Sequence, residues 1–177
     1  MKQTVKFSSL LLAVALTGSV LFSSCDKDDD PTPTPDPTIT DVGVSDPNFS
    51  ILEAAVIKAE LADDLAQPGA LTVFAPDNAA FTAAGITEAA VATLSKEVLV
   101  DILTYHVLGA KVTADMVPAS DAVTTLQGES LFASKNANGV FVNGVKVTTA
   151  DVPASNGVIH VINGVLKAPT QTIAQIA

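Results

Sequence analysis

Few side chains in this sequence could carry out chemistry, and the two histidines come first among them. His106 and His160 could each act as a base or bind a metal ion. They stand 54 positions apart, with no cysteine or cluster of acids beside either one, which is not the spacing of a zinc site. Both lie in apolar company, in YHVL and VIHVI, so each ring needs a hydrogen-bond partner in the interior. We therefore predict two structural histidines. Tyr105, the only tyrosine, is predicted to be a core residue with a hydrogen-bonded hydroxyl.

Other catalytic arrangements lack their defining residues. The sequence has no Gly-x-Ser-x-Gly segment and no glycine-rich phosphate loop, and its single cysteine, Cys25, stands directly after an apolar leader. A glycosidase needs two carboxylates that face one cleft. The available aspartates are spaced so that no pair is predicted to meet: Asp77, Asp101, Asp115, Asp121 and Asp151. We expect no enzyme activity, no cofactor and no metal site.

The start of the chain is typical of an exported protein. Two lysines precede an apolar run over residues 7–22, and small residues follow at Ser23 and Ser24. A persistent membrane helix is the weaker interpretation, because the run is short and contains several polar residues. The sequence LFSSC resembles a bacterial lipoprotein box, in which the cysteine becomes the lipidated first residue. Phe22 departs from the commonest form of that box, which has leucine at this position. We predict a signal peptide over residues 1–24 and lipidation of Cys25; the alternative is a secreted protein with a free thiol.

Residues 25–43 are predicted to be a tether. Residues 26–41 are acidic and then rich in proline and threonine, with almost no apolar content, which favours an extended spacer. The aspartates at its start have the spacing of a calcium loop, but Pro31 and Pro37 occupy the positions of the required glycine and glutamate. The Lys-Asp-Asp run after Cys25 resembles the surface-export signal of Bacteroidetes lipoproteins, and a plain solvated spacer is the alternative. The predicted location is the outer membrane, facing the cell surface, with a periplasmic or secreted location as the alternative.

Length and composition describe one acidic domain. Removing 25 residues from 177 leaves 152, which is enough for a single domain with its own core. Hydrophobic residues make up 48% and aromatic residues 5%, so aliphatic side chains must fill the core. All nine basic residues are lysine; removing Lys2 and Lys6 gives a net charge of 7 − 19 = −12. Such a chain, without arginine, is a poor partner for nucleic acid or for anionic ligands.

The middle of the chain predicts helices, and the remainder predicts strands. Asp46 and Pro47 begin a helix that ends near residues 68–69. Its predicted buried face consists of Phe49, Leu52, Val56 and Ala59. A short strand follows at residues 71–75, and further helices begin near Asp77 or Asn78, Thr87 and Ser95.

From residue 107 onward the chain consists of short β-branched runs separated by Asn-Gly turns. Asn143-Gly144, between FV and VKV, is a strong signal for a two-residue hairpin. Helices followed by antiparallel strands predict an α+β fold.

Three segments resemble the fasciclin-type domain. They are LTVFAPDNAAF at residues 71–81, LTYHV at 103–107 and NGVIHVINGVL at 156–166. The resemblance covers residues 44–170 and leaves a tail at 171–177. It implies a β-wedge or sandwich of short antiparallel strands with several helices packed on one side. Asn163 stands where the family usually has Asp, and LKAP loosens the usual leucine-proline exit. In animal members the last two segments are implicated in integrin binding, and we do not expect that receptor assignment to transfer.

The expected function is adhesion without catalysis. Partners would be the membrane, through lipid on Cys25, and a protein or glycan on another cell or matrix. The polar residues beside the fasciclin-type segments are the candidate contacts: Asp77, Asn78, Asp151 and Asn156. The alternative is a carrier or sensor domain that binds a small apolar ligand or a glycan, with an apolar groove between the helices and the sheet.

Overall fold

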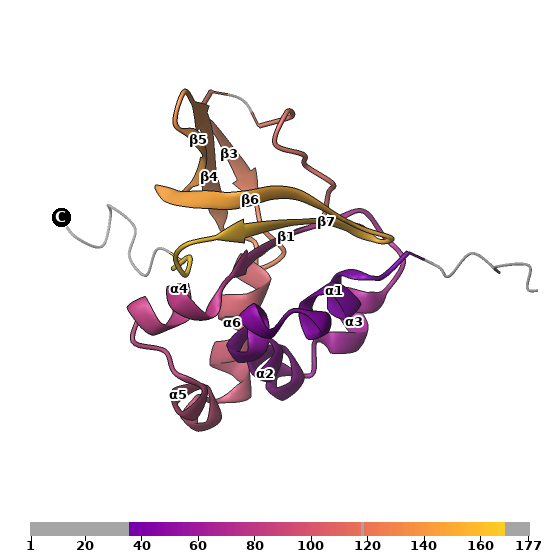
Figure 1. Cartoon of the computed structure of the whole chain (residues 1–177), viewed down its shortest axis with the longest axis vertical. Coiled ribbons are helices and arrows are strands. Elements are labelled where there is room, and N and C mark those ends of the chain that lie inside the picture. Colours follow the sequence, from indigo (N-terminus) through magenta and orange to yellow (C-terminus); the bar gives the residue numbers. More distant parts are fainter. Residues whose placement is uncertain (1–35, 118, 169–177) are drawn as a thin grey trace, which may run out of the picture. The chain divides into compact units, whose positions relative to one another are not determined.

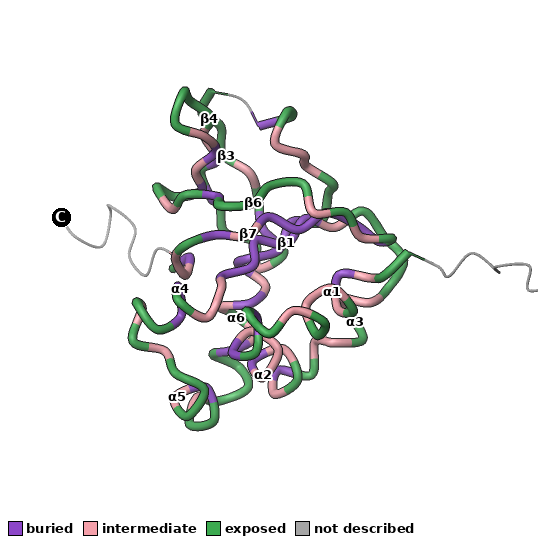
Figure 2. Tube along the Cα trace, viewed as in Figure 1, coloured by how far each residue is buried: buried purple, intermediate pink, exposed green. Residues whose placement is uncertain are grey.

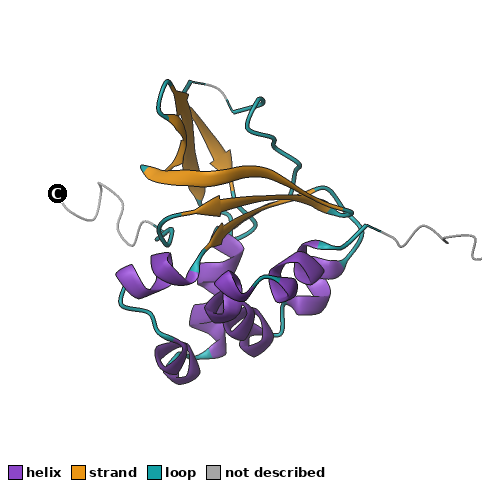
Figure 3. Cartoon of the chain, viewed as in Figure 1, coloured by secondary structure: helices purple, strands orange, loops and turns teal. Residues whose placement is uncertain are grey.

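The computed structural model describes residues 36–117 and 119–168. Its helices come mainly before residue 106 and its strands mainly after, and the helices lie together on one side of the sheet (Figures 1 and 3). The helices are α1 (Ile39–Ser45), the 3-10 helix η1 (Pro47–Phe49), α2 (Ser50–Ala59), α3 (Ala62–Ala66), α4 (Asn78–Ala83), α5 (Glu88–Thr93) and α6 (Lys96–Tyr105). None of these is long and apolar enough to cross a bilayer.

The strands form one sheet in the order β2-β1-β7-β6-β5-β4-β3. They are β1 (Leu71–Pro76), β2 (Val107–Leu108), β3 (Asp121–Thr124), β4 (Ser130–Asn136), β5 (Gly139–Val142), β6 (Val145–Ala154) and β7 (Gly157–Ile162). The long strand β6 joins the two halves of the sheet, because its first residues pair with β5 and the rest pair with β7. Register shifts within β6 bend it between these two partners. The predicted α+β class is confirmed.

The central pair of the sheet, β1 and β7, is parallel, whereas the sequence led us to expect antiparallel strands throughout. Leu71 lies beside Gly157 and Pro76 beside Ile162. A parallel pair needs a long connection between its strands, and here the connection includes three helices and all five other strands. The close approach also explains Gly157, because a Cβ there would lie 2.2 Å from the Leu71 carbonyl oxygen.

The central pair is buried along most of its length (Figure 2), and its residues belong to core clusters on both faces of the sheet. One core cluster fills the space between β1, β7 and the inner faces of β4 and β5, and it includes Phe74, Leu131, Val142 and Ile162. A second cluster lies among the helices, around Ile51, Phe81, Leu99 and Leu103. A third joins α1 and η1 to β1 and β7 through Ile39, Phe49, Val73 and Ile159.

The helix predicted from Asp46 to residues 68–69 is two helices after a short 3-10 turn. Asp46 accepts a hydrogen bond from the Asn48 N–H and Pro47 takes the first position, so the predicted start is confirmed. The helix α2 ends at Glu60, which adopts a left-handed conformation with φ of 57°. The buried face of α2 is also rotated about the helix axis relative to the predicted face. It contains Ile51, Ala55 and Ala59, while Leu52 and Val56 are half-buried at its edge.

The Asn143-Gly144 hairpin is confirmed. Both residues have positive φ, 49° and 80°, as a two-residue turn of this kind requires. The Asn143 side chain also accepts a hydrogen bond from the Phe132 N–H at 2.8 Å, while its own N–H donates to the Phe132 carbonyl at 2.7 Å. The turn is therefore tied to β4 as well as joining β5 to β6.

The packed structure begins before residue 44, so the predicted end of the tether at residue 43 is too late. Thr38 caps α1 in a reciprocal arrangement with Asp41, and Ile39 is buried. The Ile39 N–H donates to the Asn156 Oδ1 at 3.0 Å, and the Ser155 N–H donates to the Pro37 carbonyl at 2.9 Å. This short helix carries too little apolar sequence to be recognised, and contacts more than 100 residues away hold it in place.

We expect Asn156→Ala to lower the free energy of unfolding by about 2–4 kcal/mol, because one buried and two part-buried backbone groups lose their partner. Those groups are the Ile39 N–H and the carbonyls of Leu65 and Gln67. Urea denaturation monitored by circular dichroism measures the change. Ser155→Ala, at the neighbouring exposed position, is the control and should stay within about 0.5 kcal/mol of the parent. Equal stability of the two variants would contradict this role of Asn156.

Candidate functional site

His106 lies at the end of α6, where the helical half of the chain passes into β2. Its ring is buried, and the Leu166 N–H donates to Nε2 at 2.9 Å. Nδ1 therefore carries the proton and donates to the Ile102 carbonyl at 2.7 Å. The main chain of His106 accepts a hydrogen bond from the Phe74 N–H in β1. Both ring nitrogens are occupied by the fold, which agrees with a structural role.

Burial lowers the pKa of His106 to about 4, and the hydrogen bond to Ile102 opposes this shift only in part. Protonation would place a second N–H at Nε2, directly against the Leu166 N–H. The ring is therefore neutral at pH 7, and protonation of His106 at low pH would destabilise the folded state.

His160 is also buried, at the centre of β7. The Asp151 N–H donates to its Nδ1 at 3.2 Å, so Nε2 carries the proton and donates to the Val112 carbonyl at 2.8 Å. Its ring stacks on Phe74, with centroids 5.5 Å apart. These contacts join β7 to β6 and to the loop after β2, and the prediction of a satisfied histidine agrees with them.

Tyr105 connects α6 to the β4–β5 half of the sheet. Its buried hydroxyl donates to the Ser130 carbonyl at 3.2 Å and accepts from the Asn143 Nδ2 at 2.8 Å. The predicted hydrogen-bonded core tyrosine is confirmed.

The predicted contact residues Asp77 and Asn78 have structural roles and are half-buried. Asp77 caps α4 by accepting from the Ala80 N–H at 2.7 Å. Asn78 caps a different helix: its Oδ1 accepts from the Ile51 N–H, and its Nδ2 donates to the Pro47 carbonyl and the Ser50 hydroxyl. These contacts join β1 and α4 to the start of α2.

Asp151 and Asn156 do not form a common exposed edge. Asn156 is only 3% exposed, so the expectation of an accessible side chain there is wrong. Its three hydrogen bonds pull it inward, toward α1 and the end of α3. Asp151 is exposed, with φ of 58° at an irregular point of β6, and its carboxylate accepts from the Ala114 N–H at 2.9 Å.

The structure shows a surface that the sequence interpretation missed. Residues that pair across neighbouring strands share one face of the sheet, so Ala122, Phe132, Ser134, Phe141 and Lys146 all lie on the outer face of β3–β6. Phe132 is 61% exposed, while its neighbours Leu131 and Ala133 point into the core. The alternation in SLFASK contains this signal, because it predicts that Phe132 points outward when Leu131 points inward.

The outer face is also free of carboxylates. Its remaining paired positions are Thr124, Ser130, Asn136 and Gly139, so the face contains two phenylalanines, small or uncharged polar residues and one lysine. In a chain with 19 acidic residues, a surface with exposed aromatic area and no carboxylate at its paired positions is unusual. Exposed aromatic residues with few charges around them are typical of protein contacts.

Among residues 36–117 and 119–168 no three histidine, cysteine or acidic side chains come together to hold a metal ion. Cys25 lies outside the described residues.

We expect the free energy of unfolding to fall by about 3 kcal/mol between pH 6.5 and pH 4, because the unfolded state binds a proton at His106 that the folded state excludes. The stability that neutral His106 contributes is fully present above pH 6.5, the ordinary pKa of histidine. It is lost as the pH falls through the folded pKa of about 4. Urea denaturation across this range measures it. His106→Gln, which does not titrate and retains an amide oxygen for the Leu166 N–H, should be less stable at pH 7 but lose less stability on acidification. The same pH dependence in both proteins would contradict the assignment.

Comparison with known proteins places this arrangement in a family. The family model for the fasciclin domain matches residues 47–169. Protein sll1483 of Synechocystis sp. is 46% identical over 134 residues, which cover 75% of this chain and 74% of that protein. Transforming growth factor-beta-induced protein ig-h3 of Sus scrofa is 39% identical over 132 residues, but the match spans only 19% of that longer protein.

A solved structure has the same fold. It contains a FAS1 domain pair from the insect cell adhesion molecule fasciclin I, and it matches with a TM-score of 0.61 and 20% identity, over 81% of this chain and 53% of that one. Residues 47–169, which the family model matches, include β1, the Tyr105-His106 junction and β7 at the centre of this fold. The chain therefore belongs to the fasciclin domain family.

Proposed function

We propose that this protein is a non-catalytic adhesion module held on the cell envelope by lipid at Cys25. The observation that carries the proposal is the outer face of β3–β6, which has no carboxylate at its paired positions and carries the exposed Phe132, on a domain whose fold is shared by an insect cell adhesion molecule. The histidines and most of the polar residues near the fasciclin segments are committed to the fold, which leaves this face as the candidate contact surface.

The proposed partner is a protein on another cell or in the matrix. A side chain as large and apolar as Phe132 contributes most when a partner covers it fully, and the hydroxyl-bearing residues around it can form the polar rim of an interface. A glycan that stacks on the two phenylalanine rings is the alternative partner, and the attachment assay below distinguishes the two.

The proposed anchor is supported by the leader and by LFSSC, which end at Cys25. An outer-membrane position facing the cell surface is consistent with adhesion, and the acidic tether would hold the domain away from the membrane.

Cys25→Ser should release the protein from membranes, because each acyl methylene contributes roughly 0.8 kcal/mol to membrane binding and the variant cannot be acylated. Fractionation and labelling with palmitate measure the change, and Ser23→Ala, which keeps a small residue before the cysteine, is the control. Complete retention of the Cys25→Ser variant, together with no label in the parent, would contradict lipid anchoring.

Phe132→Ser should reduce attachment of protein-coated beads to cells or matrix by at least tenfold while leaving the circular dichroism spectrum unchanged, because an exposed side chain contributes little to stability. Val98→Ser on α6, also an exposed apolar residue, is the matched control and should attach like the parent. Protease treatment of the target surface should abolish attachment if the partner is a protein, whereas glycosidase treatment should abolish it if the partner is a glycan. Equal attachment by Phe132→Ser and the parent would exclude this face.

A further inference from the structure

The apolar groove between α1, α2 and the sheet is a cavity that the adhesion proposal does not use. It has a volume of about 120 Å³, and its walls include Ile39, Leu52, Val56, Leu65, Val73 and Val107. Leu52 and Val56 are the half-buried residues that belong to the predicted core face of α2, and Val44 and Ile57 at the mouth are 56% and 60% exposed. Leu52 and Val56 therefore pack against the helical core on one side and line an open space on the other.

The polar groups beside this cavity are already occupied by the protein. The Thr40 hydroxyl donates to the Ala62 carbonyl at 3.2 Å, and both nitrogens of His106 bond to the main chain. A ligand inside the groove would find no free hydrogen-bond donor on either residue and no free acceptor on the His106 ring. Because buried polar groups without partners are costly, the part of a ligand that enters must be a hydrocarbon.

The size of the cavity limits this hydrocarbon part. An engineered cavity of about 150 Å³ in another protein holds benzene, so 120 Å³ accommodates an aliphatic chain of about four or five carbons. Any further carbons would lie along Val44 and Ile57 at the mouth.

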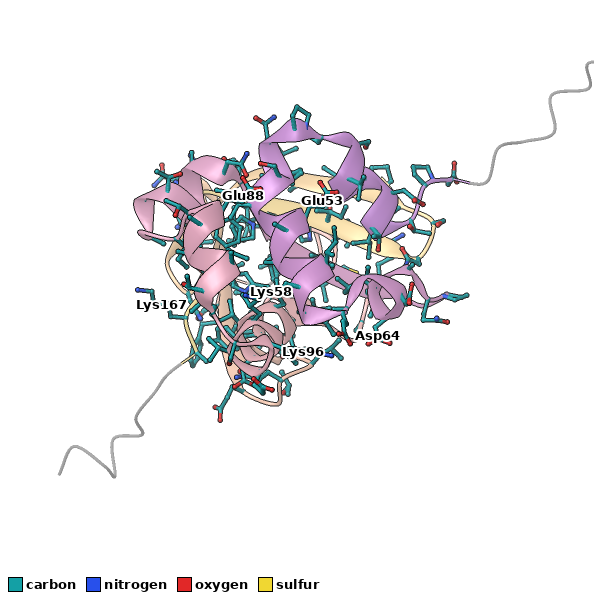
Figure 4. The ribbon with its side chains drawn as sticks, turned by 90° about the horizontal axis from the view of Figure 1, so that it is seen from below. Glu53, Lys58, Asp64, Glu88, Lys96 and Lys167 are labelled. Carbon is teal, nitrogen blue, oxygen red and sulfur yellow. The ribbon has the colours of Figure 1, made fainter. Side chains whose placement is uncertain are left out.

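The charges at the mouth decide which head group fits. Glu53 on α2 is part of the lining, and no lysine is. An adjoining, more open hollow of about 360 Å³, which shares Leu65, Leu103 and Val107 with the first, also has an acid at its rim, Asp64, and no lysine. Figure 4, seen from the helical side, labels Glu53 and Lys58 on α2 and Asp64 on α3.

The nearby lysines are held elsewhere. The Lys58 ammonium donates to the carbonyls of Val91 and Ala92 at the end of α5, and Lys96 pairs with Glu60. A carboxylate head group would therefore meet only negative charge at the mouth, whereas an ammonium would meet Glu53.

We propose that this groove binds small aliphatic amines, with the alkyl chain between α2 and the sheet and the ammonium beside Glu53. The proposal is independent of the adhesive surface, because the outer face of β3–β6 contributes no residue to the groove.

Titration of the purified full-length protein with n-alkylamines from propylamine to heptylamine, followed by methyl NMR, tests this proposal. The dissociation constant should fall about fourfold for each added methylene up to pentylamine and less steeply beyond it, because about 0.8 kcal/mol per buried methylene corresponds to that factor. Valine and leucine methyl signals of the groove should shift. Pentanoate, of the same chain length, should bind at least tenfold more weakly than pentylamine.

Two variants narrow the groove by different routes. A Cβ built on Gly43, which is part of the lining, meets nothing within 4 Å, so the side chain of Gly43→Leu can begin there without a clash and fill part of the groove. Val56→Phe enlarges a side chain in the opposite wall. Both should abolish saturable binding, while Ala83→Leu, at an exposed position on α4, should bind like the parent. Thermal denaturation of each variant confirms that it is folded.

Glu53→Gln should remove most of the preference for amine over carboxylate, and Glu88→Gln, which makes the same change of charge at an exposed position on α5, should not. The proposal would be overturned if none of the alkylamines saturates the protein. It would also be overturned if a folded Gly43→Leu or Val56→Phe variant binds pentylamine as tightly as the parent does. Equal affinity for pentylamine and pentanoate would overturn the assignment of the amine.

Discussion

The parallel pairing of β1 with β7 is the contact on which the rest of this structure depends. It joins residues 71–76 to residues 157–162, and both strands are buried almost throughout. Neither strand can form without the other, because each would expose an apolar surface and unpaired backbone groups. Three polar interior residues support this pair. The main-chain carbonyls of His106 and Asn156 accept hydrogen bonds from the N–H groups of Phe74 and Leu71, and the His160 ring stacks on Phe74. Even the glycine at the start of β7 is explained by how closely β1 approaches it.

The two buried histidines show how this chain uses polar groups in an otherwise aliphatic core. Each ring bridges backbone groups from segments far apart in the sequence: Ile102 with Leu166, and Asp151 with Val112. An aliphatic side chain could fill the same volume but would leave those backbone groups without partners. The rings therefore fix which segments lie together, while the surrounding valines, leucines and isoleucines supply the buried area. Chemistry at either ring would require the fold to release it first.

Local features of this fold could be predicted from the sequence, and features that depend on distant contacts could not. The hairpin at Asn143-Gly144, the cap at Asp46 and the structural histidines follow from turn chemistry, capping and apolar surroundings. The break at Glu60 was missed because glutamate carries no helix-stop signal, and the helical pattern continues on both sides of it. The Asn-Gly pair at residues 156–157 predicts an exposed turn, but the Asn156 amide instead bonds backbone groups 89 to 117 positions away. Phe132 was overlooked because an apolar residue in a strand is normally assigned to the core.

The attachment of α1 to Asn156 has a consequence for the order in which the chain folds. The hydrogen bond from Ile39 to Asn156 closes a loop of 117 residues, and contacts of such long range form late, because the entropy of the loop must be overcome before the contact contributes. A helix of seven residues is unstable by itself in water. The first helix of the described residues, α1, therefore docks among the last, after the β6–β7 turn has formed. When the protein is pulled from its N-terminal side, the same helix is the first to detach, and it leaves the central strands paired behind it.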